Sequence, residues 1–245
     1  MTRSQTILTV SLALAASVIY AVMWVGHAQD WGWLHSLDWS LLNAAHDIGI
    51  KHPAWVRFWD GVSLVVGPAV LRPLGLVAAA IALVKGKMRI ALLLLACLPL
   101  NGFITMTAKG LAGRPRPATA LVAAHSTSFP SGHALEATAS VLALLVVVLP
   151  LLRSRSTRLV AVTVGALSVL TVGIARVALN VHHPSDVIAG WALGYVYFLV
   201  CLWVFRPPPV FGSGRASHDL APVGLSQPGD PTGAEPLLDP EARRI

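Results

Sequence analysis

The residues best suited to chemistry lie in three short stretches between positions 109 and 186. The last stretch reads Arg-Val-Ala-Leu-Asn-Val-His-His-Pro-Ser-Asp over positions 176–186. Asp186 follows His182 by four residues across an expected helix start, so its carboxylate can accept a hydrogen bond from one ring N–H of His182. Such a bond selects one tautomer of the imidazole and leaves the other nitrogen free to act as a nucleophile.

The middle stretch reads Ser-Thr-Ser-Phe-Pro-Ser-Gly-His over positions 126–133 and runs directly into an apolar helix. Ser131 is expected to cap this helix, and Gly132 lets the backbone approach a ligand closely. Free N–H groups at a helix N-terminus form an anion site, and His133 lies at the same end. A plain N-cap with an incidental histidine is an equally good interpretation of this motif taken alone.

The elements that carry these stretches are expected to be membrane helices. Hydrophobic residues make up 55% of the chain and charged residues 12%, whereas an average soluble domain has about a quarter charged residues. Several mostly apolar runs approach the length of about 20 residues that crosses a bilayer. They are 7–26, 62–84, 89–108, 133–152, 158–180 and 184–205. The expected fold is an all-α, polytopic membrane bundle of about six transmembrane helices.

Basic residues in the short loops predict how the bundle is oriented. The Lys and Arg side chains at 85–89 and at 153–158 fall on one side if every run crosses the membrane. Positive residues in short loops are typical of the cytoplasmic side. Both termini are then cytoplasmic, and the segments 27–61, 109–132 and 181–183 face outward. The first run could instead be a cleaved signal peptide, although its apolar core is longer than a typical one.

This topology places the candidate residues at one outer membrane edge. Lys109 and Arg116 follow the third run, and Arg176 closes the fifth. Charge at membrane depth is costly and usually functional. With the N–H groups before His133, these basic residues would hold a phosphoryl group and offset its charge in the transition state. Two histidines would supply a nucleophile and a general acid.

The three stretches resemble the signature motifs of the type-2 phosphatidic acid phosphatases, a family in the superfamily of bacterial acid phosphatases and vanadium haloperoxidases. The matching motifs are Lys109-x6-Arg116-Pro117, Pro130-Ser131-Gly132-His133 and Arg176-x5-His182-x3-Asp186. They occur in the family's order, and an outward-facing site on about six spans is typical of its membrane branch.

The resemblance implies a role for each matching residue. His182 would attack phosphorus and form a phosphohistidine, Asp186 would orient His182, and His133 would protonate the leaving alcohol. The phosphate oxygens would be bound by Lys109, Arg116, Ser131, Gly132 and Arg176. The resemblance also implies a reaction without cofactor or metal ion, and no His, Cys, Asp and Glu set in the sequence has metal-ligand spacing.

A few positions near the motifs need separate treatment. Ala175 stands where the family often has serine, which implies a missing hydrogen bond and a lower rate. Arg114 offers a second Arg-Pro pair but lacks the family spacing, and it could contact an anionic head group. His125 and His183 are expected to be solvated loop residues. Glu136 is expected either to tune His133, which is one helical turn away, or to face the pocket.

The rest of the chain divides into two kinds of segment. Five of the eight tryptophans lie within 27–61, which predicts an outer interfacial segment, with 37–60 lying along the membrane surface. The membrane-embedded phosphatase domain is therefore expected over 1–205. Residues 206–245 are rich in proline and glycine and lack apolar periodicity, which is typical of a disordered tail, here cytoplasmic.

The expected function is metal-independent hydrolysis of a lipid phosphate or lipid diphosphate, phosphatidic acid-like or polyprenyl, at the extracytoplasmic face. One alternative is a lipid phosphotransferase, which would use the same intermediate with another acceptor. Another is a non-enzymatic protein that binds or transports anionic lipids, although binding alone would not require a tautomer-fixed histidine.

The expected partners are the lipid phosphate substrate and membrane lipids, and homo-oligomerisation is left open. The net charge of +7 does not indicate nucleic acid, because the basic residues lie in short clusters between apolar runs.

Overall fold

The computed structural model describes residues 3–207, so the predicted disordered tail lies outside the described residues from position 208 onward. Within 3–207 the regular elements are all helices. They are α1 (Arg3–Ala28), α2 (Gly32–Lys51), α3 (Pro53–Val65), α4 (Pro68–Val84), α5 (Met88–Cys97), α6 (Gly102–Ala112), α7 (Gly132–Val148), the 3₁₀ helix η1 (Leu149–Leu151), α8 (Arg155–Ala178) and α9 (Pro184–Phe205).

The described helices form six segments that are long and apolar enough to cross a membrane, which confirms the predicted all-α membrane bundle. Two of these segments are each built from a pair of helices, α3 with α4 over Pro53–Val84 and α5 with α6 over Met88–Ala112. The second span is thus longer than the predicted 62–84. The stretch 53–60, which was expected along the membrane surface, belongs to α3, which packs beside α8.

The breaks within these two spans have local causes. The second span is interrupted at residues 66–67, just before Pro68, which takes the first helical position of α4. The third is interrupted over 98–101, where Pro99 cannot donate a helix hydrogen bond. The Asn101 amide donates to the carbonyl oxygen of Cys97 at 2.6 Å and to that of Glu136 at 3.3 Å. Asn101 therefore connects α7 to this break, and its bond to Cys97 compensates for part of the lost backbone hydrogen bonding.

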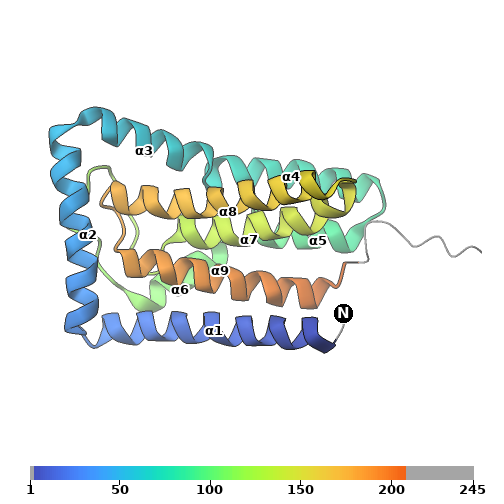
Figure 1. Cartoon of the computed structure of the whole chain (residues 1–245), viewed down its shortest axis with the longest axis horizontal. Coiled ribbons are helices and arrows are strands. Elements are labelled where there is room, and N and C mark those ends of the chain that lie inside the picture. Colours follow the sequence, from blue (N-terminus) through green and yellow to red (C-terminus); the bar gives the residue numbers. More distant parts are fainter. Residues whose placement is uncertain (1–2, 208–245) are drawn as a thin grey trace, which may run out of the picture. The chain divides into compact units, whose positions relative to one another are not determined.

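Helix α2 lies across one end of the bundle, as Figure 1 shows, whereas the other long helices run lengthwise. It turns Leu34 and Leu42 into the protein, where they are 2% and 0% exposed, and leaves Trp33 exposed. The α4–α5 and α7–α8 connections and the start of α1 lie at the opposite end (Figure 1). The basic loops therefore gather at one end of the bundle and α2 lies at the other.

Two glycines set the close packing of α7 against α9. A Cβ atom on Gly190 would lie 2.6 Å from the carbonyl oxygen of Ser131, and one on Gly194 would lie 2.5 Å from that of Leu135. Both distances are shorter than van der Waals contact, so only glycine allows this approach. The Ser131 N–H then donates to the Asp186 carbonyl at 2.9 Å. The N-terminus of α7 is thereby held against the first turn of α9.

Candidate active site

A cavity of about 380 Å³ opens where α4, α6, α7 and α8 meet the segment before His182. Most of the predicted site residues line it: Lys109, Arg116, Gly132, His133, Arg176 and His182. These come from α6, the 113–131 segment, the start of α7, the end of α8 and the turn that follows α8. Ser131 and Asp186 are fully buried beside this group and do not line the cavity.

His182 reaches the cavity from the turn between α8 and α9 and is only 1% exposed. Its Nε2 atom lies 3.2 Å from Nη1 of Arg116. Because a guanidinium can only donate, Nε2 is the acceptor and carries the free lone pair. Burial lowers the pKa of the His182 ring from its ordinary value of 6.5 to about 3, against the opposing effect of Asp186. The imidazole is therefore neutral at pH 7, as a nucleophile must be.

Asp186 lies on the Nδ1 side of the His182 ring. Its Oδ2 atom is 3.5 Å from Nδ1, which is longer than a normal hydrogen bond, and Nδ1 has no closer partner among the described residues. Oδ2 also accepts from the His183 N–H at 2.8 Å and from the Ser128 hydroxyl. Catalytic hydrogen bonds are often long without substrate, and this arrangement already directs the carboxylate at Nδ1.

Three cationic side chains surround the cavity, as the motifs predicted. Arg116 is held by the carbonyl oxygens of Ser126 and Val181, each at 2.6 Å. Lys109 is buried and donates to the carbonyl oxygens of Thr127 and Ser128. Arg176 is 7% exposed and donates from Nη1 to the Ser63 hydroxyl at 2.9 Å.

One donor of Arg176 is unused. Its Nε atom is buried and has no hydrogen-bond partner among the described residues. A buried donor without a partner is costly, so a phosphate oxygen within its reach would be strongly favoured.

The start of α7 supplies further donors. Ser131 occupies the predicted N-cap position, but its side chain makes no capping bond, and its hydroxyl is buried without a partner among the described residues. Ser131 therefore stands at the predicted N-cap position but does not cap the helix with its side chain. Gly132 permits close packing at this point, because a Cβ there would lie 2.7 Å from Cγ2 of Thr105. Gly132 and His133 of the first turn of α7 line the cavity, and the first-turn N–H groups of a helix have no partner within that helix.

Glu136 and Arg72 form an ion pair at the edge of the same cavity, with 2.8 Å between Nη2 and Oε2. The Glu136 side chain is 6% exposed and that of Arg72 is 47% exposed. Of the two interpretations of Glu136, facing the pocket is the one that the geometry bears out. Arg72 brings a further cation to the cavity, which the motifs did not include.

Two expectations about neighbouring residues were wrong. His183 is buried rather than solvated, and it caps α9 reciprocally with Asp186. Arg114 is also buried, and its guanidinium pairs with Asp186 at 2.6 Å and with Asp38 at 2.9 Å. The burial of both side chains was missed because both lie in loops. A loop position in the sequence does not show whether the loop is covered by a helix such as α2. His125 is exposed, as predicted, and Ala175 is fully buried.

Several polar residues of the site were missed by sequence reasoning. They hold the predicted residues in place, Ser126 from the wall of the cavity and the others from behind it, and are Asp38, Ser63, Ser126 and Ser128. Asp38 carried the one available signal of such a role. It lies among tryptophans, and an acidic residue that faces the bundle from an interfacial segment needs a partner. The serines carry no such signal.

Among residues 3–207, no three His, Cys, Asp or Glu side chains are grouped so that they could hold a metal ion.

The described part of the chain is thus a helical membrane bundle that places a neutral histidine and a neighbouring carboxylate at a cationic cavity able to hold an anion. The family model described as the PAP2 superfamily matches residues 90–208. The phosphatidylglycerophosphatase B of Bacillus subtilis is 33% identical over 171 residues, which cover 68% of this chain and 82% of the relative.

The crystal structure described as the first transmembrane PAP2 type phosphatidylglycerolphosphate phosphatase from Bacillus subtilis has the same fold. It aligns with a TM-score of 0.64 at 27% identity, over 81% of this chain and 96% of that one. The chain therefore belongs to the PAP2 superfamily of phosphatases, as the three motifs predicted. It is a multi-pass membrane protein and a PAP2-type lipid phosphatase.

Proposed function

We propose that the enzyme hydrolyses a lipid phosphate through a phosphohistidine on His182, at the extracytoplasmic face of the membrane and without a metal ion. The observation that carries this proposal is the placement of His182. Its neutral Nε2 faces a cavity lined by Lys109, Arg116 and Arg176, while a carboxylate lies on the Nδ1 side. A phosphate in that cavity would meet a nucleophile and its charge-stabilising groups together.

The first step forms the phosphohistidine. The Nε2 lone pair of His182 attacks phosphorus, and the bond from phosphorus to the leaving oxygen breaks. His133, which is protonated once the phosphate dianion is bound beside it, gives its proton to that oxygen. The cations Lys109, Arg116 and Arg176 and the N–H groups of α7 offset the charge on the three remaining phosphoryl oxygens. Asp186 accepts from Nδ1–H and so stabilises the positive charge that develops on His182.

The second step releases phosphate. His133, now neutral, removes a proton from water as the water oxygen attacks phosphorus. The bond between phosphorus and Nε2 breaks, and its electron pair returns to His182. Inorganic phosphate leaves and both histidines return to their starting states. An alcohol in place of water would complete a phosphotransfer.

The walls of the cavity favour a lipid substrate. Ala69 and Arg72 of α4 and Met106 of α6 line the cavity and are exposed on the surface of the membrane-spanning bundle. A lipid whose head group enters the cavity could leave its chains on this surface. The positive-inside pattern supports an extracytoplasmic site, because the basic loops are at the end of the bundle opposite α2 (Figure 1).

Phosphatidylglycerophosphate is the first substrate to test, because both named relatives are phosphatases of that lipid. Phosphatidic acid and a polyprenyl diphosphate are the other members of the panel. The cavity of about 380 Å³ accommodates a phosphorylated head group of any of the three.

The test is phosphate release by the purified full-length protein in detergent, with excess chelator and each lipid of the panel. We expect release that survives chelation and is lost in His182→Ala, and an acid-labile phosphoenzyme that forms in the wild type and not in His182→Ala. The matched control is His125→Ala, because His125 is an exposed histidine outside the cavity.

Release that persists in His182→Ala, or that chelation abolishes, would contradict the proposed mechanism. Transfer of phosphate to an added alcohol in preference to water would instead favour the phosphotransferase.

A further inference from the structure

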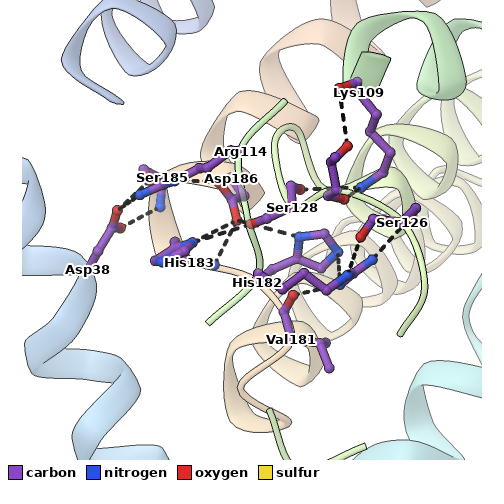
Figure 2. Close-up of polar contacts among 12 residues, drawn as sticks. Asp38, Lys109, Arg114, Ser126, Ser128, Val181, His182, His183, Ser185 and Asp186 are labelled. Carbon is purple, nitrogen blue, oxygen red and sulfur yellow. Dashed lines mark hydrogen bonds and ion pairs between the residues drawn. The ribbon is translucent and has the colours of Figure 1, made fainter. Parts of the chain in front are cut away.

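A buried polar network behind the cavity joins α2 to the first turn of α9. Its centre is the Arg114 guanidinium, which bridges two carboxylates (Figure 2). Nη1 donates to Asp186 Oδ1 at 2.6 Å and to the Ser185 hydroxyl at 2.7 Å, and Nη2 donates to Asp38 Oδ2 at 2.9 Å. Asp38 and Asp186 are 0% exposed, so neither charge is solvated.

Arg114 and His182 approach different oxygens of Asp186. Arg114 binds Oδ1, whereas His182 Nδ1 faces Oδ2 at 3.5 Å. A carboxylate held at one oxygen by a charged donor has its side-chain rotation restricted. Arg114 is therefore placed to fix the carboxylate from the Oδ1 side, while the His183 N–H and the Ser128 hydroxyl bind Oδ2, and Arg114 does this without touching the cavity itself.

Asp38 holds the other side of the guanidinium and ties it to α9. Its carboxylate accepts from the Ser185 N–H at 2.9 Å and from the Ser185 hydroxyl at 2.6 Å, as well as from Arg114. The two carboxylates thus share one arginine, and the residue next to Asp186 is fixed from the same side. Helix α2, which crosses the end of the bundle, carries Asp38 into this position (Figure 1).

Stability alone does not explain this arrangement. Burying ionic groups costs solvation energy, and apolar replacements of similar volume are often neutral or stabilising. The network also lies directly behind the proposed nucleophile, where the orientation of one carboxylate matters most.

We propose that Arg114, held by Asp38, is a positioning residue that orients the Asp186 carboxylate toward His182. The inference rests on the proposed function, in which Asp186 orients the nucleophilic histidine. It assigns a role to an arginine outside the three motifs and to an acidic residue of the interfacial helix.

The test compares Arg114→Gln, Asp38→Asn and Asp186→Asn in the full-length protein, with phosphatidic acid in detergent micelles. We expect Arg114→Gln to lower kcat about 100-fold, as small misplacements of catalytic groups do. KM should stay within about twofold, because Arg114 does not line the cavity. Asp38→Asn should lower kcat less, because Arg114 keeps its bond to Asp186.

Asp47→Asn is the matched control for Asp38→Asn. It removes the same charge from the same helix, but Asp47 is exposed. Its kcat should be that of the wild type. The midpoint of thermal unfolding, measured for every variant, identifies the folded ones.

A double-mutant cycle separates positioning from a general structural effect. In the Asp186→Asn background, Arg114→Gln should lower kcat by no more than about threefold, because the group through which it acts is already altered. Equal fold-losses in both backgrounds would overturn the inference, as would a wild-type kcat in folded Arg114→Gln. If Arg114→Gln does not fold, Asp38→Asn takes its place in the cycle with the same criteria.

His182→Ala, assayed alongside, distinguishes the two ways of failing. Full activity in His182→Ala would overturn the proposed function. Loss of activity in His182→Ala, together with a wild-type kcat in folded Arg114→Gln, would overturn the positioning role alone.

Discussion

At the scale of single residues, burial controls the chemistry of this site. His182 is nearly inaccessible, and removing its ring from water keeps it neutral by lowering its pKa to about 3. Its neighbours are equally constrained, because Arg116 is held by two carbonyl oxygens and Asp186 by Arg114. The site is therefore organised before substrate arrives, which lowers the reorganisation needed in the transition state.

The buried His182 ring predicts a loss of stability in acid. Its folded-state pKa of about 3 lies below the ordinary value of 6.5, so the unfolded chain binds a proton first as the pH falls. Stability is lost progressively from pH 6.5 toward 3, by about 2 kcal/mol at about pH 5. The thermal midpoint of the wild type should therefore fall more steeply on acidification than that of His182→Gln. Parallel midpoint curves would contradict this prediction.

The Arg72–Glu136 pair gives a second prediction at this scale. Arg72→Ala should raise KM about tenfold, because it removes a cation from the cavity and leaves the buried Glu136 carboxylate unpaired beside the phosphate. Adding Glu136→Gln to Arg72→Ala should recover part of that loss, since a neutral amide does not repel phosphate. Steady-state kinetics of the two variants measures both effects. A double variant with a higher KM than Arg72→Ala would contradict the prediction.

At the scale of elements, the α7–α9 contact positions the site. Gly190 and Gly194 lie on one face of α9, one helical turn apart, and let α7 approach closely. The N-terminus of α7 and the first turn of α9 meet because of this contact, through the bond from the Ser131 N–H to the Asp186 carbonyl.

Substitution of Gly190 should therefore affect both stability and activity. Gly190→Ala is expected to lower the free energy of unfolding by about 1–3 kcal/mol, since its Cβ would meet backbone that cannot move away. The matched control is Gly110→Ala in α6, where a Cβ would meet nothing within 4 Å. Alanine is the better helix former, so that variant should be neutral or slightly stabilised. Denaturation in detergent compares the two, and equal stability would contradict the role of Gly190.

At the scale of the whole molecule, the two ends of the described bundle differ in the basic residues of their short loops. The basic loops lie at one end, and α2 with its tryptophans lies at the other (Figure 1). Such an asymmetry orients a protein in a bilayer, because short positive loops stay in the cytoplasm.

Orientation can be measured with single cysteines. Cys97 and Cys201 are buried, so the native background should be low. Asp47→Cys on α2 should react with a membrane-impermeant maleimide in right-side-out vesicles, whereas Ser156→Cys, at the start of α8, should react only after permeabilisation. Both positions are exposed in the structure. The reverse labelling pattern would place the active site in the cytoplasm.

Much of this protein could be predicted from its sequence. Long apolar runs cannot remain in water, so composition alone indicated a membrane bundle, and the spans fell close to where hydropathy placed them, except that the second begins at Pro53 instead of residue 62. The motif residues were also predictable, because a nucleophile, an acid and phosphate-binding cations need particular residue types at particular spacings. The structure gathers six of the eight predicted side chains around one cavity.

Only the tertiary structure decided what lies behind that cavity. Arg114, His183 and Asp38 are buried because α2 covers the end of the bundle, and no local pattern records such a contact. The two residues of such a contact are up to 147 positions apart in the sequence, as in the bond from the Ser185 N–H to Asp38. Spacing along the chain predicts neighbours within a helix or across one turn, whereas a charge shared among distant segments depends on how whole helices pack.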